Sequence, residues 1–592
     1  MVTHSSLSII ATLAILFSYH EAASFAPGRA LILPPTSFNT KLRLEHKTYH
    51  LDAFRAFNKV TNTDLRRGNT KLQASLIAPL AKVALKVSPT LRNAVLLGVA
   101  ALAIAKRRQL LYPGSSPDPN YSEPLPPGSF GCPFFGKNIL KGTKENGPGQ
   151  FFRERATELG NPSMFKYVFF GKPIITVTGM KNIKQVFSTE FKNIRTASSI
   201  PAFRKLFGTE SLIMCPNSEE HSFLRRLVGA SMTPESIEKA IPVLQKTTTE
   251  QIDKLLESQT AAMEDVCTNF TLDIAWRQIL GLNLDEAEIP RFHDTVNDWI
   301  GGILNPRVMF LPGVRFTKAG RAHAYLVSQI EKKIDELDSN GPDGSTLSAM
   351  LFAKDSEQNK RLSRQQIIDN SLLLILAGSE TSASTLTDAM LLLGLHPEVY
   401  QKLKEEQRAL AARYGDTLTR EQLDKECPYL EAVIKETMRI KPLAGGGANR
   451  AVLETLVVDG MQIPKGYGVA FNIPLTHALD PTVRQPDGSH MDVVKGFKPE
   501  RWLSSATRPS EFVPFGYGPR YCLGANLAMA EMKVFLASFA RRVDFDLVNM
   551  TKEKVTWKKS SIIPKPEDGA VIAPRPSSSQ PTLSRELAGT AA

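Results

Sequence analysis

The stretch that most constrains the fold is a proline-free run of about thirty residues, 364–395, "RQQIIDNSLLLILAGSETSASTLTDAMLLLGL". It predicts one helix, which at about 1.5 Å per residue crosses a whole domain. Its middle is apolar on nearly all sides and then turns small and polar. Gly378 and the hydroxyls of Ser379, Thr381 and Ser382 weaken helical hydrogen bonding, so they predict a locally opened helix that faces something. Close helix packing through small residues is the alternative.

Most other segments of the chain also show helical periodicity. Clear examples are residues 241–259, 322–340 and 397–415. Strand-like segments bounded by turn residues are fewer, and they cover residues 172–179, 454–466 and 468–473. We therefore expect a large, mainly α-helical domain with small β-sheets.

The charge of the chain is unevenly distributed. The 592 residues carry a net charge of +13, which would suit nucleic-acid binding if it were spread over the folded domain. Residues 1–110 hold 15 Lys and Arg against 4 Asp and Glu, so nearly all of the surplus lies there. The remainder is close to neutral, and we expect no nucleic-acid partner.

The first 75 residues read as a targeting leader. Residues 1–24 have an apolar core and end in small side chains, which predicts a signal peptide. Residues 25–75 are basic, rich in hydroxyls and poor in acids, as transit peptides are. The junction "AASFAP", with Phe25 after the expected cleavage point, resembles the two-part plastid leader of algae with secondary, red-derived plastids. That resemblance implies a plastid location, and a leader for the endoplasmic reticulum is the alternative.

Further boundaries follow from composition. Residues 76–110 combine an amphipathic stretch, the apolar run "AVLLGVAALAIA" and a basic cluster, which predict a membrane anchor or surface helix. A buried helix of the folded domain is the alternative. Residues 111–124 are dense in proline and predict a stiff linker. We expect the catalytic domain over residues 125–560 and a flexible tail over residues 561–592.

Cys522 stands apart among five widely spaced cysteines, which form no CxxC pair and predict neither a disulfide framework nor a zinc ribbon. It lies in the pattern Phe515-x-x-Gly518-x-Arg520-x-Cys522-x-Gly524, whose glycines allow a tight turn close to a flat ligand. A predicted helix follows at once, and its N–H groups favour a thiolate. A lone thiolate suits an axial ligand of haem iron, because zinc and iron–sulfur sites need several ligands.

At this loop the sequence resembles the cytochrome P450 family, and the resemblance covers about residues 125–560. The segment "AGSETS" at residues 377–382, the pair Glu436-x-x-Arg439, and "FKPERW", which supplies Arg501, occur in that family's order. The resemblance implies the P450 fold, mainly α with small β-sheets, and a haem b cofactor. It also implies that Glu436, Arg439 and Arg501 form a buried structural charge network.

The resemblance assigns the loop residues to the haem. Cys522 is expected to bind the iron and Phe515 to shield the sulfur. Arg520 is expected to hold a haem propionate by charge-assisted hydrogen bonds. Gly518 and Gly524 complete the cofactor-binding loop.

Three more residues are expected near the propionates. His221 and Arg225 lie one helical turn apart in "HSFLRRL", so both side chains would face the same way. A solvated helix face with a surface histidine is the alternative. Arg450 occupies a position where members of the family often hold the other propionate.

The groove of the long helix is expected to serve oxygen chemistry. By resemblance, Ala377 and Gly378 line the oxygen-binding groove. Thr381 and Glu380 are expected to be catalytic, because an alcohol and an acid with ordered water suit proton delivery.

These residues imply a monooxygenase that uses O2 and a separate electron donor, which would be a ferredoxin in a plastid or an NADPH-dependent P450 reductase on the endoplasmic reticulum. The segments "LPPGSFGCPFFG" and "GGANRAVLETLVVDGMQIPKGYGVAF" look most like the branch that oxidises sterols, retinoids and terpenoids. Glycines 445–447 are expected to leave room for an apolar, isoprenoid-derived substrate, such as a carotenoid, sterol, terpenoid or prenylated secondary metabolite. An O2-independent peroxide isomerase or dehydratase is the alternative, although such relatives often lose the threonine present at Thr381. A haem sensor or carrier is a further alternative.

Overall fold

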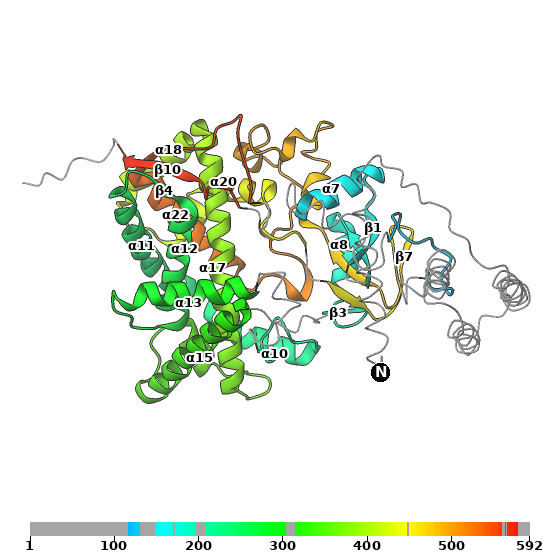
Figure 1. Ribbon diagram of the computed structural model, residues 1–592, viewed down its shortest axis with the longest axis horizontal. Coiled ribbons are helices and arrows are strands. Elements are labelled where there is room, and N and C mark those ends of the chain that lie inside the picture. Colours follow the sequence, from blue (N-terminus) through cyan, green and yellow to red (C-terminus); the bar gives the residue numbers. More distant parts are fainter. Residues whose placement is uncertain are drawn as a thin grey trace, which may run out of the picture. The chain divides into compact units, whose positions relative to one another are not determined.

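The predicted long helix is confirmed as α17, Arg364–Leu395, which runs without a break (Figure 1). Ser363 begins it with a capping box, in which Ser363 and Gln366 each accept from the other's backbone N–H. The expected local opening is wrong. The hydroxyls of Ser379 and Thr381 donate to the carbonyls four residues back, at 2.5 and 2.6 Å. A carbonyl oxygen has two lone pairs, so the helix accommodates these bonds without opening.

The computed structural model describes residues 116–130, 148–169, 172–196, 208–303, 314–446, 449–558, 563 and 565–577. Besides α17, its helices are α7 (Pro148–Glu158), α8 (Met180–Phe187), α10 (Ser218–Gly229), α11 (Pro234–Leu256), α12 (Met263–Ile274), α13 (Glu288–Ile303), α15 (Val314–Asn340), α16 (Thr346–Phe352), α18 (Pro397–Tyr414), α19 (Arg420–Lys425), α20 (Pro428–Ile440), α21 (Ile473–Ala478) and α22 (Ala525–Arg542). Short helical turns are η1 (Ala230–Met232), η2 (Ala275–Leu280), η3 (Ser489–Met491), η4 (Pro499–Trp502) and η5 (Gly518–Arg520). Strands are β1 (Met164–Phe169), β2 (Lys172–Val177), β3 (Ile194–Thr196), β4 (Ala261–Ala262), β5 (Arg450–Val452), β6 (Leu456–Val458), β7 (Met461–Ile463), β8 (Gly468–Phe471), β9 (Val543–Leu547) and β10 (Val571–Pro576).

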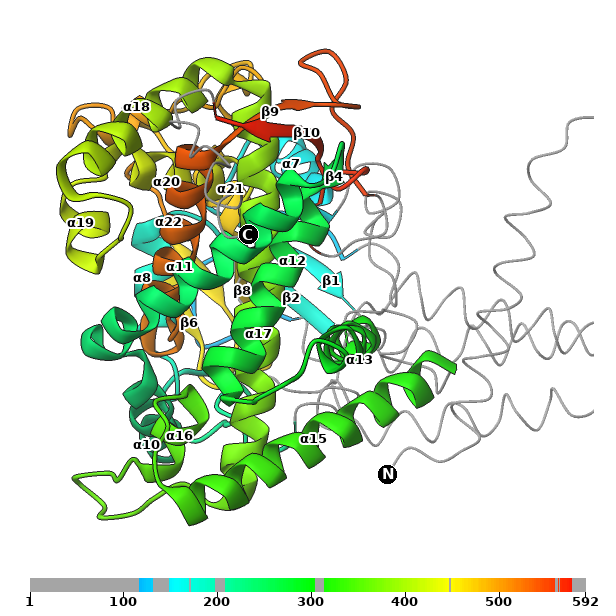
Figure 2. The ribbon, with the colours of Figure 1, turned by 90° about the vertical axis from the view of Figure 1, so that its left-hand side faces the viewer.

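Helices surround α17 on several sides. α12 lies alongside it, and α15 crosses near its first turn, where Arg364 pairs with Asp335 at 2.8 Å (Figure 2). α20 and α22 also pack against it. The helices predicted over residues 241–259, 322–340 and 397–415 are confirmed as parts of α11, α15 and α18.

The strands form small sheets. Over the described ranges, the largest sheet has five strands in the order β1-β2-β8-β5-β3, with β2 and β8 parallel and the other neighbours antiparallel. Smaller sheets join β4-β10-β9 and β6-β7. The predicted strands are confirmed as β2, the β6–β7 hairpin and β8, so the mainly helical fold with small sheets is confirmed as well.

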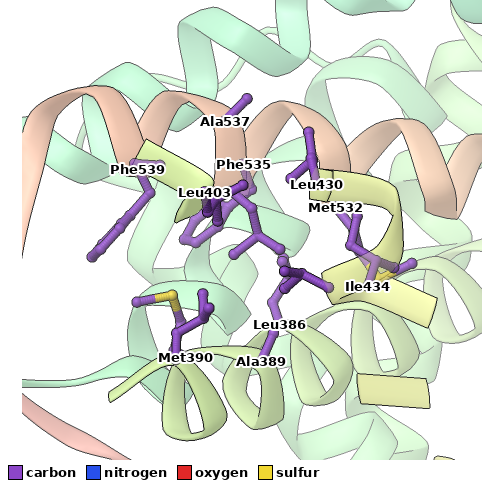
Figure 3. Packing of buried hydrophobic residues seen from close by; sticks show 14 of the residues in the cluster. Leu386, Ala389, Met390, Leu403, Leu430, Ile434, Met532, Phe535, Ala537 and Phe539 are labelled. Carbon is purple, nitrogen blue, oxygen red and sulfur yellow. The ribbon is translucent and has the colours of Figure 1, made fainter. Parts of the chain in front are cut away.

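The main hydrophobic core fills the space between α17, α18, α20 and α22 (Figure 3). Its buried side chains include Leu386, Ala389, Met390, Leu403, Leu430, Ile434, Met532, Phe535, Ala537 and Phe539. Burying one such large apolar side chain contributes roughly 1.5–3 kcal/mol. The packing therefore holds α17 firmly over the half that follows its small, polar segment.

The predicted linker is partly a docked segment. Of residues 111–124, the structure describes 116–124, and these contact the β6–β7 region. The N–H of Asp118 donates to Gln462 Oε1 at 2.7 Å, and its carboxylate accepts from the Thr455 hydroxyl at 2.5 Å. The folded domain therefore begins at least seven residues before the expected boundary at 125 because specific polar contacts hold this proline-rich stretch in place.

The predicted tail over residues 561–592 begins too early. Val571–Pro576 form β10, which pairs with β9 along its length and with β4 at its first two residues. Pro574 and Pro576 made this segment look unstructured. Both lie beyond the pairing with β4, on a stretch bonded on one side only, where a missing N–H is tolerated.

The predicted signal peptide (1–24), transit peptide (25–75) and membrane anchor (76–110) lie outside the described residues. Within the part that the structure describes, no helix combines the length and apolar character needed to cross a membrane.

Glu436 is the centre of a buried charge network. Its carboxylate accepts from the guanidinium of Arg439, Nε of Arg501 and the indole N–H of Trp502, each at 2.9 Å. The side chains of Glu436 and Arg439 are fully buried. Arg439 also donates to the carbonyl of His490 at 2.7 Å. The structure thus brings the three predicted network residues together and joins α20 to η4.

Replacing Glu436 by glutamine should lower the free energy of unfolding by about 3–5 kcal/mol, because two arginines would lose the carboxylate that balances them inside the protein. Denaturant unfolding followed by circular dichroism measures the loss. Glu421→Gln is the matched control, since Glu421 pairs with Lys425 on the surface and both side chains are 73% exposed. That control should lose less than about 0.5 kcal/mol. Similar losses in both variants would show that the network carries no special stability.

Candidate functional site

Cys522 lies in a tight loop between η5 and α22. Its N–H donates to the carbonyl of Phe515, and the N–H of Tyr521 donates to the carbonyl of Gly518, both at 2.9 Å. Gly518 has a φ of +81°, and a Cβ there would lie 2.5 Å from the carbonyl oxygen of Phe187. Glycine is needed because the backbone is left-handed and because the loop passes against the end of α8.

The side chain of Cys522 is exposed, whereas the other three described cysteines are buried and free. Protein atoms nevertheless surround it closely, and the resulting burial raises the pKa of the thiol. The N–H of Gly524 and the charge of Arg225 act in the opposite direction. The predicted support for a thiolate is therefore present but outweighed by burial. A cation bound to the sulfur would reverse that balance.

Phe515 occupies the start of the same loop. Its partly buried side chain packs against the main core, and its ring lies 6.4 Å from that of Tyr521, edge to face. This packing restrains the chain on one side of Cys522.

Basic side chains converge on the loop from separate elements. His221 and Arg225 come from α10, Arg450 from β5 and Arg520 from η5. Burial first, and then the charges of Arg520, Arg225 and Arg450, lower the pKa of His221 to about 4. His221 is therefore neutral at neutral pH. It is 3% exposed, so the alternative of a surface histidine is wrong.

Glu190 joins this group, and sequence analysis missed it. Its side chain is 2% exposed and follows α8. Oε2 lies 2.6 Å from Nε of Arg450, and Oε1 lies 2.9 Å from Nε of Arg520. The partners are 260 and 330 positions away in the sequence. No local pattern links them, so only the fold reveals the contact.

One short face of α17 is open. Ala377 is exposed and Gly378 and Thr381 are partly exposed, although residues 367–375 and 382–393 are buried. A Cβ on Gly378 would lie 3.3 Å from the side chain of Ile279, so this glycine also allows close packing against η2. Small residues thus leave one accessible face, called the groove below, on a helix that is otherwise enclosed.

Glu380 lies beside this groove and has an unpredicted partner. Its carboxylate lies 2.6 Å from Nζ of Lys565, which is also 3.3 Å from Glu264 at the start of α12. Burial disfavours the charge on Lys565, but the two carboxylates outweigh burial and raise its pKa. Lys565 was expected in a flexible tail, and the pairing of β10 instead holds its segment against α12.

A buried carboxyl group contacts α17 from α22. The hydroxyl of Ser382 donates to Glu531 Oε2 at 2.7 Å, and burial raises the pKa of Glu531 to about 7. Sequence analysis did not single out Glu531. The bond ties the helix that carries Thr381 to the helix that follows Cys522.

The glycines expected to leave room for substrate have a different explanation where the structure describes them. A Cβ on Gly446 would lie 2.1 Å from the carbonyl oxygen of Phe471, so this glycine permits close packing against β8. Gly445 has open space around its Cα, and Gly447 lies outside the described residues. The contacts of Gly445 and Gly446 therefore support a role in a turn more directly than a role in a substrate cavity.

His477 connects the charge network to the cysteine loop. Its Nδ1–H donates to the carbonyl of Arg439 at 3.1 Å, and its Nε2 accepts from the N–H of Val513 at 3.0 Å. Burial lowers the pKa of His477 to about 4. A neutral ring is needed here, because protonation of Nε2 would break the bond to Val513.

These features match the parts of a haem. An exposed sulfur could bind the iron, three arginines could bind the two propionates, and the accessible face of α17 could contact a bound ligand. Among the residues the structure describes, no group of three or more His, Cys, Asp or Glu side chains is arranged to hold a metal ion.

Replacing Gly518 by alanine should destabilise the protein more than replacing Gly516. Both glycines have positive φ values, +81° and +77°, so each variant loses about 1–2 kcal/mol to backbone strain. A Cβ at Gly518 also meets a backbone oxygen at 2.5 Å, whereas one at Gly516 meets the ring of Phe471 at 3.6 Å. Denaturant unfolding of both variants tests this, and equal losses would contradict the close approach to α8.

His477 should make stability depend on acid. Its pKa is about 4 in the folded protein against an ordinary value near 6.5, so below about pH 6.5 the unfolded chain binds a proton that the folded chain does not. Stability therefore falls as the pH drops from about 6.5 to about 4. His477→Gln should be less stable at neutral pH but show a flatter dependence over this window. Parallel pH curves for the two proteins would rule out the contribution of His477.

Comparison with known proteins agrees with this geometry. The family model for cytochrome P450 matches residues 126–572. The protein named cytochrome P450 120 from Synechocystis sp. is 30% identical over 440 residues, which cover 73% of this chain and 94% of that protein. Cytochrome P450 26B1 from Xenopus tropicalis is 29% identical over 481 residues, with coverage of 78% and 89%.

A solved structure shares the fold. Retinoic acid-bound cyanobacterial CYP120A1 superposes with a TM-score of 0.65 and 28% identity, covering 77% of this chain and all of that one. Because the family model spans most of the chain, the chain belongs to the cytochrome P450 family, whose members are monooxygenases with a haem-thiolate cofactor.

Proposed function

We propose that this P450 monooxygenase oxidises an apolar, isoprenoid-derived substrate such as a carotenoid, sterol, terpenoid or prenylated secondary metabolite. The observation that carries the proposal is the similarity over 77% of the chain to a relative whose structure holds retinoic acid, itself an isoprenoid-derived acid. The similarity to cytochrome P450 26B1 over a comparable span supports the same branch.

Cys522 is proposed as the iron ligand. Arg450 and Arg520, with Arg225 from α10, would hold the propionates by charge-assisted hydrogen bonds. Phe515, Gly518 and Gly524 would shape the loop beneath the ring. When bound, haem supplies the activation of O2, which thiolate ligation favours.

Thr381 and Glu380 would manage protons in the groove. The Thr381 hydroxyl donates to the carbonyl of Ala377 at 2.6 Å. The hydroxyl oxygen of Thr381 can still accept a hydrogen bond from another donor, such as water. Glu380 is ion-paired with Lys565 at 2.6 Å, and a carboxyl group beside the groove could relay protons through ordered water. Ala377 and Gly378 are small residues, which would leave space for a ligand beside the helix.

Electrons and location are further parts of the proposal. A ferredoxin would donate electrons if the leader directs the protein to a plastid, and an NADPH-dependent P450 reductase would do so on the endoplasmic reticulum. The basic, partly apolar region 76–110 would bind the membrane surface.

The alternative is an O2-independent peroxide isomerase or dehydratase. Thr381 on the open face of α17 favours the monooxygenase, because proton delivery to oxygen needs such a hydroxyl and a rearrangement does not. A non-catalytic haem carrier would need neither Thr381 nor Glu380.

The purified holoenzyme should bind retinoic acid and related isoprenoids more tightly than a saturated fatty acid of similar length. Both ligands carry a carboxylate and a long apolar chain, so the comparison isolates the branched, rigid isoprenoid body. Titrations followed by the haem absorption spectrum measure the affinities, with Cys522→Ala as the control for thiolate ligation. We expect at least about tenfold preference, equivalent to about 1.4 kcal/mol.

Turnover separates the reaction classes. Product that appears only with O2 and a reduced electron donor supports the monooxygenase. Product from a lipid peroxide without O2 supports the isomerase. Equal affinity for the fatty acid and the isoprenoids would overturn the proposed substrate class and leave the family assignment intact.

A further inference from the structure

Glu190 is a buried acid shared by two arginines of the haem site. Arg450 and Arg520 both approach it through Nε, at 2.6 and 2.9 Å, and all three side chains are at most 10% exposed. Each guanidinium donates to the carboxylate through its Nε edge. This contact restrains the orientation of both guanidinium planes.

The second amino group of Arg520 is fixed as well. Its Nη2 donates to the carbonyl of Cys215, while Nη1 lies 3.5 Å from the carbonyls of Leu212 and Ile213, at the outer limit of hydrogen bonding. Nη1 is therefore the least committed donor of Arg520 and the one best able to take a stronger acceptor.

Phe191, next to Glu190, adopts a rare backbone conformation. Its φ is +73°, in the left-handed region that a bulky residue seldom occupies. Its ring lies 5.0 Å from the Arg520 guanidinium and 5.0 Å from the ring of His221. The turn is closed by a hydrogen bond of 2.7 Å from the N–H of Phe191 to the carbonyl of Ile194. The strained turn thus places the carboxylate of Glu190 and the ring of Phe191 against the guanidinium of Arg520.

The charges of the group balance those of a haem. Arg225, Arg450 and Arg520 are three cations, His221 is neutral, and Glu190 is one anion, which leaves two positive charges. The two propionates of a haem carry two negative charges. Without Glu190 the group would hold one uncompensated cation beside the buried Arg450 and Arg520, where an unpaired charge is costly.

We propose that Glu190 and Phe191 form a clasp that positions Arg450 and Arg520 for the haem propionates and adjusts the charge of the site to match them. Glu190 is a positioning residue: it acts on the cofactor through the arginines. The inference rests on the haem cofactor of the family and not on the proposed substrate, so its tests need no substrate.

Two variants separate the effect of the negative charge of Glu190 from the effect of the length of its side chain. Glu190→Gln removes the anion, so the holoenzyme should lose haem to excess apomyoglobin about tenfold faster, and its haem reduction potential should move to a more positive value. Glu190→Asp keeps the charge but is shorter by one methylene and cannot reach both arginines. It should lose haem faster than the parent while its potential stays closer to the parent value.

Glu220→Gln is the matched control, because this acid lies on α10 beside His221 but is exposed to solvent. It should leave both measurements unchanged. Haem loss at the parent rate in Glu190→Gln and Glu190→Asp would overturn the proposal, as would an unchanged potential in Glu190→Gln. If Glu190→Gln does not fold, Glu190→Asp decides alone through its rate of haem loss.

Discussion

The burial of α17 is the constraint on which the rest of the structure depends. This 32-residue helix is enclosed along most of its length by α12, α15, α20 and α22 (Figure 2). Its one open face carries Ala377, Gly378 and Thr381. Residues 367–375 and 382–393, which lie before and after that face, are buried. The helix that follows Cys522 is bonded to it through Ser382 and Glu531.

Two buried carboxylates each form ion pairs with two arginines. Glu436 gathers Arg439 and Arg501, and Glu190 gathers Arg450 and Arg520. The first network is closed by protein groups and joins α20 to η4. Together with Arg225, the second group has two positive charges in excess, which equals the negative charge of two propionates. The same ion-pair chemistry joins α20 to η4 in one place and is proposed to serve haem binding in the other.

The C-terminal segment that carries Lys565 and β10 connects the β4-β10-β9 sheet to the groove of α17. Pairing of β10 with β9 and β4 fixes the segment that carries Lys565, and this lysine meets Glu380 and Glu264. Glu380, next to Thr381, is thereby part of an ion pair. A residue far along the chain thus provides the cation that pairs with the acid beside the groove.

Local sequence determined the elements and the chemistry they carry. The limits of α17, the strands β2 and β8, and the glycine-rich turn around Cys522 follow from periodicity, proline and glycine placement and short-range hydrogen bonding, which act within a few residues. Tertiary structure alone decided which distant charges meet. Glu190 finds Arg450 and Arg520 across 260 and 330 positions, and Lys565 finds Glu380 because a proline-containing strand is paired. Such contacts depend on the path of the whole chain, and no local pattern encodes them.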